Sequence, residues 1–310
     1  MSHPSGDQYE ISAAGYQAVV TECGAGLRVL DYDGRPLVAG YPEHEPASAG
    51  RGQLLVPWPN RIEDGRYAFA DSDLQLPVNE VARNNAIHGL VRWSAWQLVE
   101  HSATSVSLRY RLLAQPGYPW TLDLQVRYDL TADGLRVSFT ATNLSPSAAP
   151  YSEGAHPYLT VGDEGVDGSV DDWELTLPAA TRLLTDDRMI PVGQTPVEGS
   201  DYDFRSPKPI GALTLDDGFT DLSRSAEGDA EVVLRNPATG ASVQLWMDRA
   251  HDFVQVFTGD GLPAGARASL AVEPMTAPAN AFRSGEGLVV LGPDGSPDDK
   301  HSSSWGIRAL

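Results

Sequence analysis

Alternation of apolar and polar side chains constrains the fold of this chain more than any other feature. Residues 105–113 and 122–130 alternate in this way, and the pattern resumes over 135–141 after the dipeptide Asp133-Gly134. A period of two predicts strands that bury one face, and an Asp-Gly between two such runs predicts a hairpin. We therefore expect antiparallel strands joined by tight turns.

Turn residues recur along the whole chain. A Pro/Gly turn separates two alternating runs within residues 231–247, and Asp33-Gly34 and Asp64-Gly65 predict two more turns. The 30 glycines and 23 prolines are typical of many short strands, and no stretch of ten residues has helical periodicity. The sequence predicts an all-β fold, a large sandwich, with residues 8–310 forming a single domain.

Charge and cysteine content exclude several classes of function. The formal net charge of -20 leaves no basic stripe to neutralise phosphates, so we expect no binding to nucleic acid or to anionic membranes. Cys23 is the only cysteine, which rules out an intrachain disulfide, and residues 1–10 do not resemble a secretion signal. We expect a cytoplasmic protein that is a monomer or a homodimer.

Several polar segments interrupt the apolar pattern and are candidates for lining a cleft. In the first, Asn60 and Arg61 lie between prolines and a predicted turn, so both can project from a rigid segment. A guanidinium offers a planar fork of donors that suits sugar hydroxyls or carboxylates. The alternative for Arg61 is a surface ion pair with one of the many acids.

Two histidines have small neighbours in the sequence. His88 precedes Gly89, which permits a close backbone approach, and the alternative is a structural, hydrogen-bonded role. His156 follows Gly154 and Ala155 in the stretch "YSEGAHPYLT". An imidazole that titrates near neutral pH is a suitable general acid, and the alternative is a ring packed in the core.

Two acidic segments complete the set. Glu273 stands before Pro274 at the expected end of a strand, where apolar neighbours can raise its pKa and make it a base. The alternative is a solvated strand end. Asp216 and Asp217 are expected to open a turn before Phe219, and an aspartate there could bind a sugar hydroxyl.

Metal and cofactor motifs are missing from the sequence. Two histidines and a carboxylate could form a metal triad, but there is no His-x-His, no H-E-x-x-H and only one cysteine. Neither a glycine-rich nucleotide motif nor G-x-S-x-G occurs. We expect no metal and no cofactor.

The order of these segments resembles the aldose 1-epimerase (galactose mutarotase) family, and its bacterial mutarotase-like subgroup in particular. The matching motifs, in chain order, are N-R-I-x-x-G-x-Y-x-F at 60–69, His88-Gly89, H-P-Y at 156–158, D-x-x-F at 216–219 and Glu273-Pro274. The resemblance implies a large antiparallel β-supersandwich. It also implies interconversion of the α and β anomers of a free aldose, without a cofactor.

The resemblance implies a role for each candidate residue. Glu273 is the implied base for the C1 hydroxyl and His156 the implied acid for the ring oxygen, expected about a sugar ring's width apart. Gly154 and Ala155 are then expected to leave room for the sugar. The implied binding residues are Asn60, Arg61, His88 and Asp216. We prefer Asp216 to Asp217 because D-x-x-F then ends on Phe219.

Departures from the family pattern leave the substrate open. The usual H-G-G is H-G-L here, and Met275 stands where the family has a glutamine. Arg83 and Arg92 flank His88, so the alternatives include an epimerase of a phosphorylated or sulfonated hexose, unless both are ordinary surface charges. Another alternative is a catalytically silent sugar-binding protein.

Overall fold

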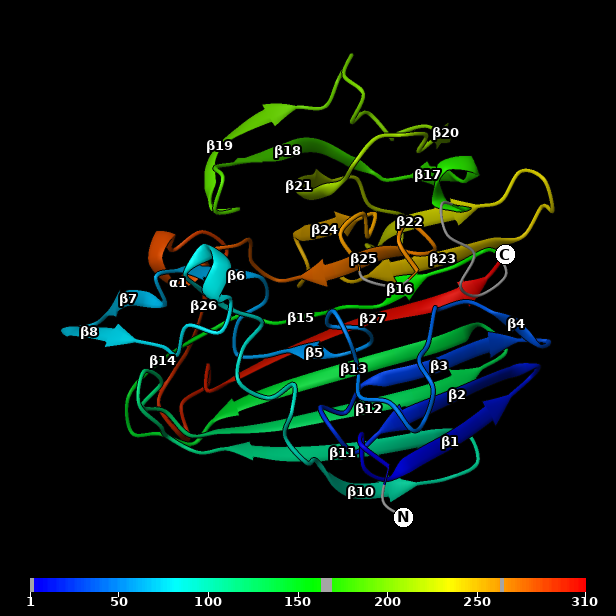
Figure 1. Ribbon diagram of the computed structural model, residues 1–310. Coiled ribbons are helices and arrows are strands. Elements are labelled where there is room, and N and C mark those ends of the chain that lie inside the picture. Colours follow the sequence, from blue (N-terminus) through cyan, green and yellow to red (C-terminus); the bar gives the residue numbers. More distant parts are fainter. Residues whose placement is uncertain (1–2, 163–168, 263–264) are drawn as a thin grey trace.

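Antiparallel strands make up most of the protein, whose computed structural model describes residues 3–162, 169–262 and 265–310 (Figure 1). Within these residues the largest sheet has nine strands. Its order is β10 (Gln97–His101), β11 (Ser105–Leu112), β12 (Leu122–Thr131), β13 (Gly134–Asn143), β27 (Lys300–Ala309), β23 (Ser242–Met247), β22 (Ala230–Arg235), β17 (Glu174–Thr176) and β20 (Lys208–Pro209).

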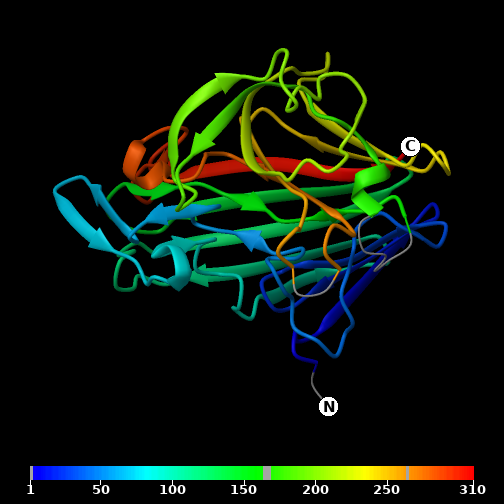
Figure 2. The ribbon, with the colours of Figure 1, turned by 45° about the horizontal axis from the view of Figure 1, so that its top comes forward.

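A second large sheet contains eight strands of the described residues and rises above the first in Figures 1 and 2. Its order is β19 (Pro191–Pro196), β18 (Ala179–Thr185), β21 (Asp216–Leu222), β24 (Phe253–Phe257), β25 (Leu270–Met275), β15 (Gly154–Ala155) and β5 (Leu54–Leu55). The short strand β16 (Tyr158–Leu159) also pairs with β25.

Smaller sheets and helical turns complete the fold. One four-stranded sheet contains β1 (Gln8–Ala13), β2 (Tyr16–Thr21), β3 (Leu27–Tyr32) and β4 (Arg35–Pro36). The two-stranded pairs are β6 (Arg61–Glu63) with β9 (Asn85–Ile87), β7 (Arg66–Phe69) with β8 (Ser72–Gln75), and β14 (Ala149–Tyr151) with β26 (Val289–Leu291). The helical turns are η1 (Val81–Arg83), η2 (Ser169–Asp172) and α1 (Ala281–Ser284). None of the described helices is long and apolar enough to cross a membrane.

The hairpins predicted from alternation are confirmed. β12 and β13 pair from Leu122–Asn143 down to Thr131–Gly134, and β22 pairs with β23 across the Pro/Gly turn. Alternate residues of β13 are buried, as a strand packed on one face requires. The all-β prediction is therefore correct.

Two local predictions are wrong. Asp216 and Asp217 do not open a turn, because they are the first residues of β21, which is paired with β18 and β24. Glu273 is not at a strand end, since it lies inside β25 between two paired neighbours. Polar side chains are tolerated at these positions because each has a partner or a cavity beside it.

The eight-stranded sheet has two different faces around β25. Leu270 and Val272 point into one hydrophobic cluster that also includes residues of the nine-stranded and four-stranded sheets. Side chains alternate along a strand, so Glu273 and Met275 lie on the opposite face. Met275 packs there in a separate small cluster. This outer face carries the candidate site.

Candidate active site

A cavity of about 710 Å³ lies over the outer face of β21, β24 and β25. All six residues singled out in the sequence line it: Asn60, Arg61, His88, His156, Asp216 and Glu273. A hollow of about 770 Å³ beside the β7–β8 hairpin contains none of them. The fold thus brings together polar residues from five separate segments of the chain.

His156 and Glu273 lie next to each other on the wall of this cavity. The cross-strand pairs on either side of them are Gly154–Met275 and Tyr158–Ala271. That register puts His156 directly opposite Glu273, and their Nε2 and Oε1 atoms are 3.3 Å apart. The separation is shorter than the sugar ring's width expected from sequence. Both residues are buried, with 5% and 3% of their surfaces exposed.

Burial shifts the two pKa values in opposite directions. Burial lowers the pKa of His156 to about 3, and Arg92 adds to the effect. Burial also raises the pKa of Glu273 well above its usual range, Asp216 adds to this, and Arg61 opposes it. The prediction that the His156 imidazole titrates near neutral pH is therefore wrong. Without a sugar, the proton shared by the pair resides on the carboxyl group.

Two buried atoms of this pair have no hydrogen-bond partner among the described residues. They are His156 Nδ1 and Glu273 Oε2. Buried polar atoms are normally paired, so these two atoms represent unused hydrogen-bonding capacity within the site. Each atom sits on a residue that lines the cavity.

Gly50, rather than Gly154, makes room beside the imidazole. A Cβ atom on Gly50 would lie 2.6 Å from His156 Cδ2, whereas one on Gly154 would lie 2.9 Å from the Pro274 backbone oxygen. Gly154 is therefore small because strands pack closely there, and Ala155 belongs to the hydrophobic core. The expectation that these two residues leave room for a sugar is wrong.

His88 is held by the backbone of Asn60. The Asn60 N–H donates to His88 Nδ1 at 3.2 Å, and the His88 N–H donates to the Asn60 oxygen at 2.9 Å. Because Nδ1 accepts, the proton of the neutral ring is on Nε2. The close backbone approach expected at Gly89 is confirmed, since a Cβ there would lie 2.0 Å from the Val56 oxygen.

His88, His156 and Glu273 are also the side chains that could hold a metal. Their possible ligand atoms all lie within 4.8 Å of one another. A metal on His88 would displace either the Asn60 hydrogen bond at Nδ1 or the proton at Nε2. Burial lowers the pKa of His88 well below its usual value, and His156 and Arg92 add to the shift, so the ring is neutral. The chemistry of this set fits proton transfer and hydrogen bonding better than metal ligation.

Arg61 is anchored before any ligand binds. Its Nε and Nη2 atoms each donate to Glu80 at 3.0 Å, while Nη1 donates to Asn60 Oδ1 at 3.3 Å. The ion pair that sequence analysis considered therefore exists, but Arg61 is buried rather than on the surface. A guanidinium fixed by a bidentate carboxylate is a rigid donor on the cavity wall.

Strand alternation separates the two aspartates. Asp216 lines the cavity and accepts a hydrogen bond from Gln255 Nε2 at 2.7 Å. Asp217 instead accepts one from Arg182 Nε at 2.7 Å and does not line the cavity. Gln255 pairs across the strands with Glu273. Gln255 was not predicted from the sequence, although it interrupts the apolar run 253–257 as a cleft-lining residue does.

Tyr158 is a second cavity residue that sequence analysis missed. Its ring stacks on His156, with centroids 5.0 Å apart and planes at 14°. Its hydroxyl donates to the Ala49 oxygen at 3.0 Å. The sequence did contain a signal for Tyr158. It follows His156 by two residues, and this spacing places both side chains on one face of an extended segment.

The two arginines that flank His88 differ in their partners. Both line the cavity, but Arg83 pairs with Glu80 at 3.1 Å. Arg92 donates to Gln53 Oε1 at 3.4 Å and has no carboxylate partner among the described residues. Arg92 therefore carries the less compensated charge on the cavity wall.

Known proteins resemble this chain along nearly its whole length. The family model for aldose 1-epimerase matches residues 7–299. The chain is 38% identical over 307 residues to the uncharacterized protein YihR of Escherichia coli K12, covering 99% of this chain and 95% of that protein. It is 27% identical over 251 residues to human galactose mutarotase, covering 76% and 71%.

Solved structures share the architecture at lower identity. A GalM/aldose epimerase homologue from C. elegans superposes with a TM-score of 0.85 at 21% identity, covering 98% of both chains. A galactose 1-epimerase from Lactobacillus acidophilus gives a TM-score of 0.77 at 20% identity, covering 96% of this chain and 92% of that one. The predicted antiparallel β-supersandwich is thereby confirmed.

Proposed function

This chain belongs to the aldose 1-epimerase family, and we propose that it interconverts the α and β anomers of a free aldose without a cofactor. The observation that carries this proposal is the 3.3 Å approach of His156 Nε2 to Glu273 Oε1 on one cavity wall. Ring opening needs a base at one oxygen and an acid at a second oxygen bonded to the same carbon. Glu273 as the base and His156 as the acid lie close enough together to meet that need.

In the proposed reaction, Glu273 takes the proton of the C1 hydroxyl while His156 gives a proton to the ring oxygen. The C1–O5 bond breaks, its electron pair stays on O5, and the electron pair of the O1–H bond forms the carbonyl. Rotation about C1–C2 then presents the other carbonyl face. Reversing both transfers closes the ring as the other anomer, so protons and electrons balance within the sugar and the two side chains.

The opposed pKa shifts of His156 and Glu273 define where their shared proton lies before and after ring opening. Burial favours the neutral pair, a carboxylic acid beside a neutral imidazole. That pair is also the state after ring opening, when Glu273 has gained the sugar proton and His156 has lost its own. The cyclic sugar requires the charged form, which arises when the proton crosses the 3.3 Å between the two residues.

The binding roles follow from the donors and acceptors on the cavity wall. We propose that the Arg61 guanidinium and the His88 Nε2–H donate to sugar oxygens, and that the Asp216 carboxylate accepts from a sugar hydroxyl. We assign Asn60 to the same set because it lines the cavity and holds both Arg61 and His88. We also propose that residues 8–310 act as one domain, supported by the shared hydrophobic cluster.

Saturation-transfer NMR on a panel of aldoses that includes glucose and galactose tests the proposal. The wild-type protein should accelerate exchange between the anomer signals, and Glu273→Gln should remove at least about a hundredfold of that acceleration. Glu286→Gln is a matched control, because that exposed carboxylate bonds to Gln194 outside the cavity. No acceleration on any aldose would refute the proposal. Sugar binding by calorimetry without acceleration would instead indicate a silent sugar-binding protein.

A second candidate function is the epimerisation of a phosphorylated or sulfonated hexose. The observation that favours it is Arg92, which lines the cavity without a carboxylate partner among the described residues. Competition by a hexose 6-phosphate but not by the unsubstituted hexose would support this candidate. Arg92→Gln should then abolish that preference, whereas Arg111→Gln, outside the cavity, should keep it.

A further inference from the structure

The tip of the β18–β19 hairpin forms one wall of the cavity. Met189 in this tip lines the cavity, and its backbone has a positive φ of 63°. The tip is braced internally, because Asp186 Oδ1 accepts hydrogen bonds from the Arg188 and Ile190 N–H groups at 2.9 and 3.0 Å. A hairpin tip of this kind is stiff, but its direction depends on what it contacts.

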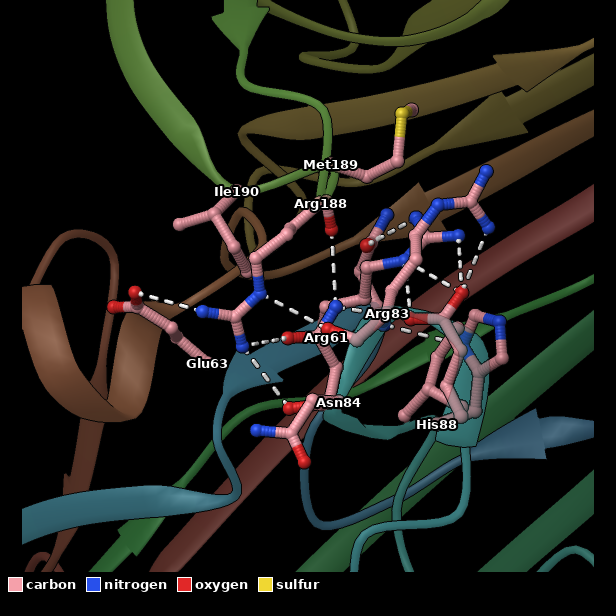
Figure 3. A network of polar contacts seen from close by, with 12 residues as sticks. Arg61, Glu63, Arg83, Asn84, His88, Arg188, Met189 and Ile190 are labelled. Carbon is pink, nitrogen blue, oxygen red and sulfur yellow. Dashed lines mark hydrogen bonds and ion pairs between the residues drawn. The ribbon is translucent and has the colours of Figure 1, made fainter.

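Arg188 ties this tip to the β6–β9 pair and its connecting segment, and Figure 3 shows it lying between Glu63 and Asn84. Its guanidinium reaches two carboxylates, one side-chain amide and two backbone oxygens. The acceptors are Glu63 Oε1 at 3.3 Å, Asp64 Oδ1 at 2.7 Å, Asn85 Oδ1 at 3.3 Å, the Arg83 oxygen at 3.0 Å and the Asn84 oxygen at 3.1 Å. A fork of donors shared among five acceptors fixes direction as well as distance.

The same contact reaches the binding arginine. The Arg188 guanidinium donates to Asn85 Oδ1 at 3.3 Å. Asn85 Nδ2 in turn donates to the Arg188 backbone oxygen and to Glu80 Oε2, each at 3.0 Å. Glu80 in turn holds Arg61 in its bidentate pair. Burial would raise the pKa of Glu80, but hydrogen bonds from Arg61 and Asn85 outweigh it and lower that pKa, so Glu80 stays ionised. One side chain therefore supports two walls of the cavity.

We propose that Arg188 is a positioning residue for the sugar, an inference that rests on the proposed function. It holds Met189 over the cavity and keeps Arg61 in place through Asn85 and Glu80. The hydrogen bonds and ion pairs of Arg188 reach neither β25, which carries the base, nor the segment between β15 and β16, which carries the acid. Arg188 consequently governs how the sugar is held rather than how its protons move.

Arg188→Met tests the proposal because it keeps the length of the side chain and removes every guanidinium donor. KM for the best aldose should rise about tenfold while kcat stays within about threefold, since the sugar is displaced but the pair is intact. Arg205→Met is the matched control, because Arg205 pairs with the nearby Asp203 at an exposed position. A KM within twofold of wild type, or an equal loss in kcat, overturns the proposal.

Hydrogen exchange of the amides in residues 186–190 gives a readout independent of activity. Arg188→Met should speed their exchange, and unchanged exchange overturns the proposal. If the wild-type protein accelerates no aldose, the proposed function fails, but this exchange measurement still decides whether Arg188 fixes the tip. If Arg188→Met does not fold, Arg188→Lys replaces it, because it keeps the charge and loses the fork.

A double-variant comparison separates positioning from general destabilisation. Met189→Ala should raise KM by itself, because it removes the wall that Arg188 holds. In the Arg188→Met background it should add little, since that wall is already displaced. Fully additive effects would overturn the proposal, because they would mean that Arg188 and Met189 act independently.

Discussion

His156 lies directly opposite Glu273 on the neighbouring strand, with 3.3 Å between Nε2 and Oε1. The two residues come from distant parts of the chain, and the register of β15 and β16 on β25 brings them together. Each is buried, each has an atom without a hydrogen-bond partner among the described residues, and their pKa values move in opposite directions. The proposed acid–base chemistry depends on this pair.

Replacing the acid should separate its chemical role from any role in packing. We expect His156→Asn to lower the anomer exchange rate by about a hundredfold or more, because a general acid contributes on that scale. The midpoint of thermal unfolding should change little, since the ring already lacks a partner at Nδ1. Exchange NMR and calorimetry measure the two effects. A collapse of stability with full residual activity would make His156 a core residue.

The pH profile of catalysis should lack an acid limb at the ordinary carboxyl pKa. Catalysis needs one shared proton on the pair, and a second proton enters only near the lowered His156 pKa of about 3. The shared proton leaves only at the raised pKa of Glu273, which lies well above 4.5. We therefore expect kcat/KM to keep its value as the pH falls through 4.5, the ordinary carboxyl pKa. A bell limited by values near the ordinary 4.5 and 6.5 would contradict this.

Filling the space at Gly50 should impair the acid. Gly50→Ala places a Cβ 2.6 Å from His156 Cδ2 at a residue with a φ of +77°. Gly34→Ala is a matched control, because Gly34 has a φ of +78° with nothing near its Cβ position. Both variants should lose about 1 kcal/mol of stability from the left-handed backbone. Only Gly50→Ala should lose kcat, and equal activity in both variants would refute the role of Gly50.

Stability should depend on pH through Glu153, which lies outside the proposed chemistry. Its carboxyl accepts hydrogen bonds from the Tyr151 and Ser303 hydroxyls, and burial raises its pKa from 4.5 to about 8. Between those values the folded state keeps the proton and the unfolded chain releases it. The free energy of unfolding should therefore fall as pH rises from about 4.5 to about 8.

Glu153→Gln isolates this contribution. The amide cannot ionise, so urea unfolding at pH 5 and at pH 8 should give values closer together in the variant than in the wild type. Asp252→Asn is a control because its carboxylate is exposed in an ion pair with Arg224. An unchanged difference between the two pH values in Glu153→Gln would show that another group causes the dependence.

Local patterns in the sequence predicted the parts of the fold that depend on local interactions. Alternation and Asp-Gly turns correctly located the β12–β13 hairpin, because neighbouring strands pair through a short connection. Glycine at position 89 correctly indicated a close backbone approach. The order of motifs correctly indicated the family, and the six candidate residues line one cavity.

Local sequence patterns could not predict contacts between distant parts of the chain. The register that sets His156 against Glu273 depends on pairing between distant strands, so the short distance between them could not be predicted. Gly50 could not be identified because nothing local shows that it faces His156. Nothing in the sequence around Arg188 distinguishes it from other arginines. Its proposed positioning role depends on hydrogen-bond acceptors in segments that are distant in the chain.

The structure of an aldose bound to the Glu273→Gln variant tests the central claim most directly. The account predicts that O1 of the sugar lies about 2.6–3.2 Å from the side chain at position 273, and that the ring oxygen lies at a similar distance from His156 Nε2. A sugar bound with C1 turned away from both residues, in several aldoses, would contradict it.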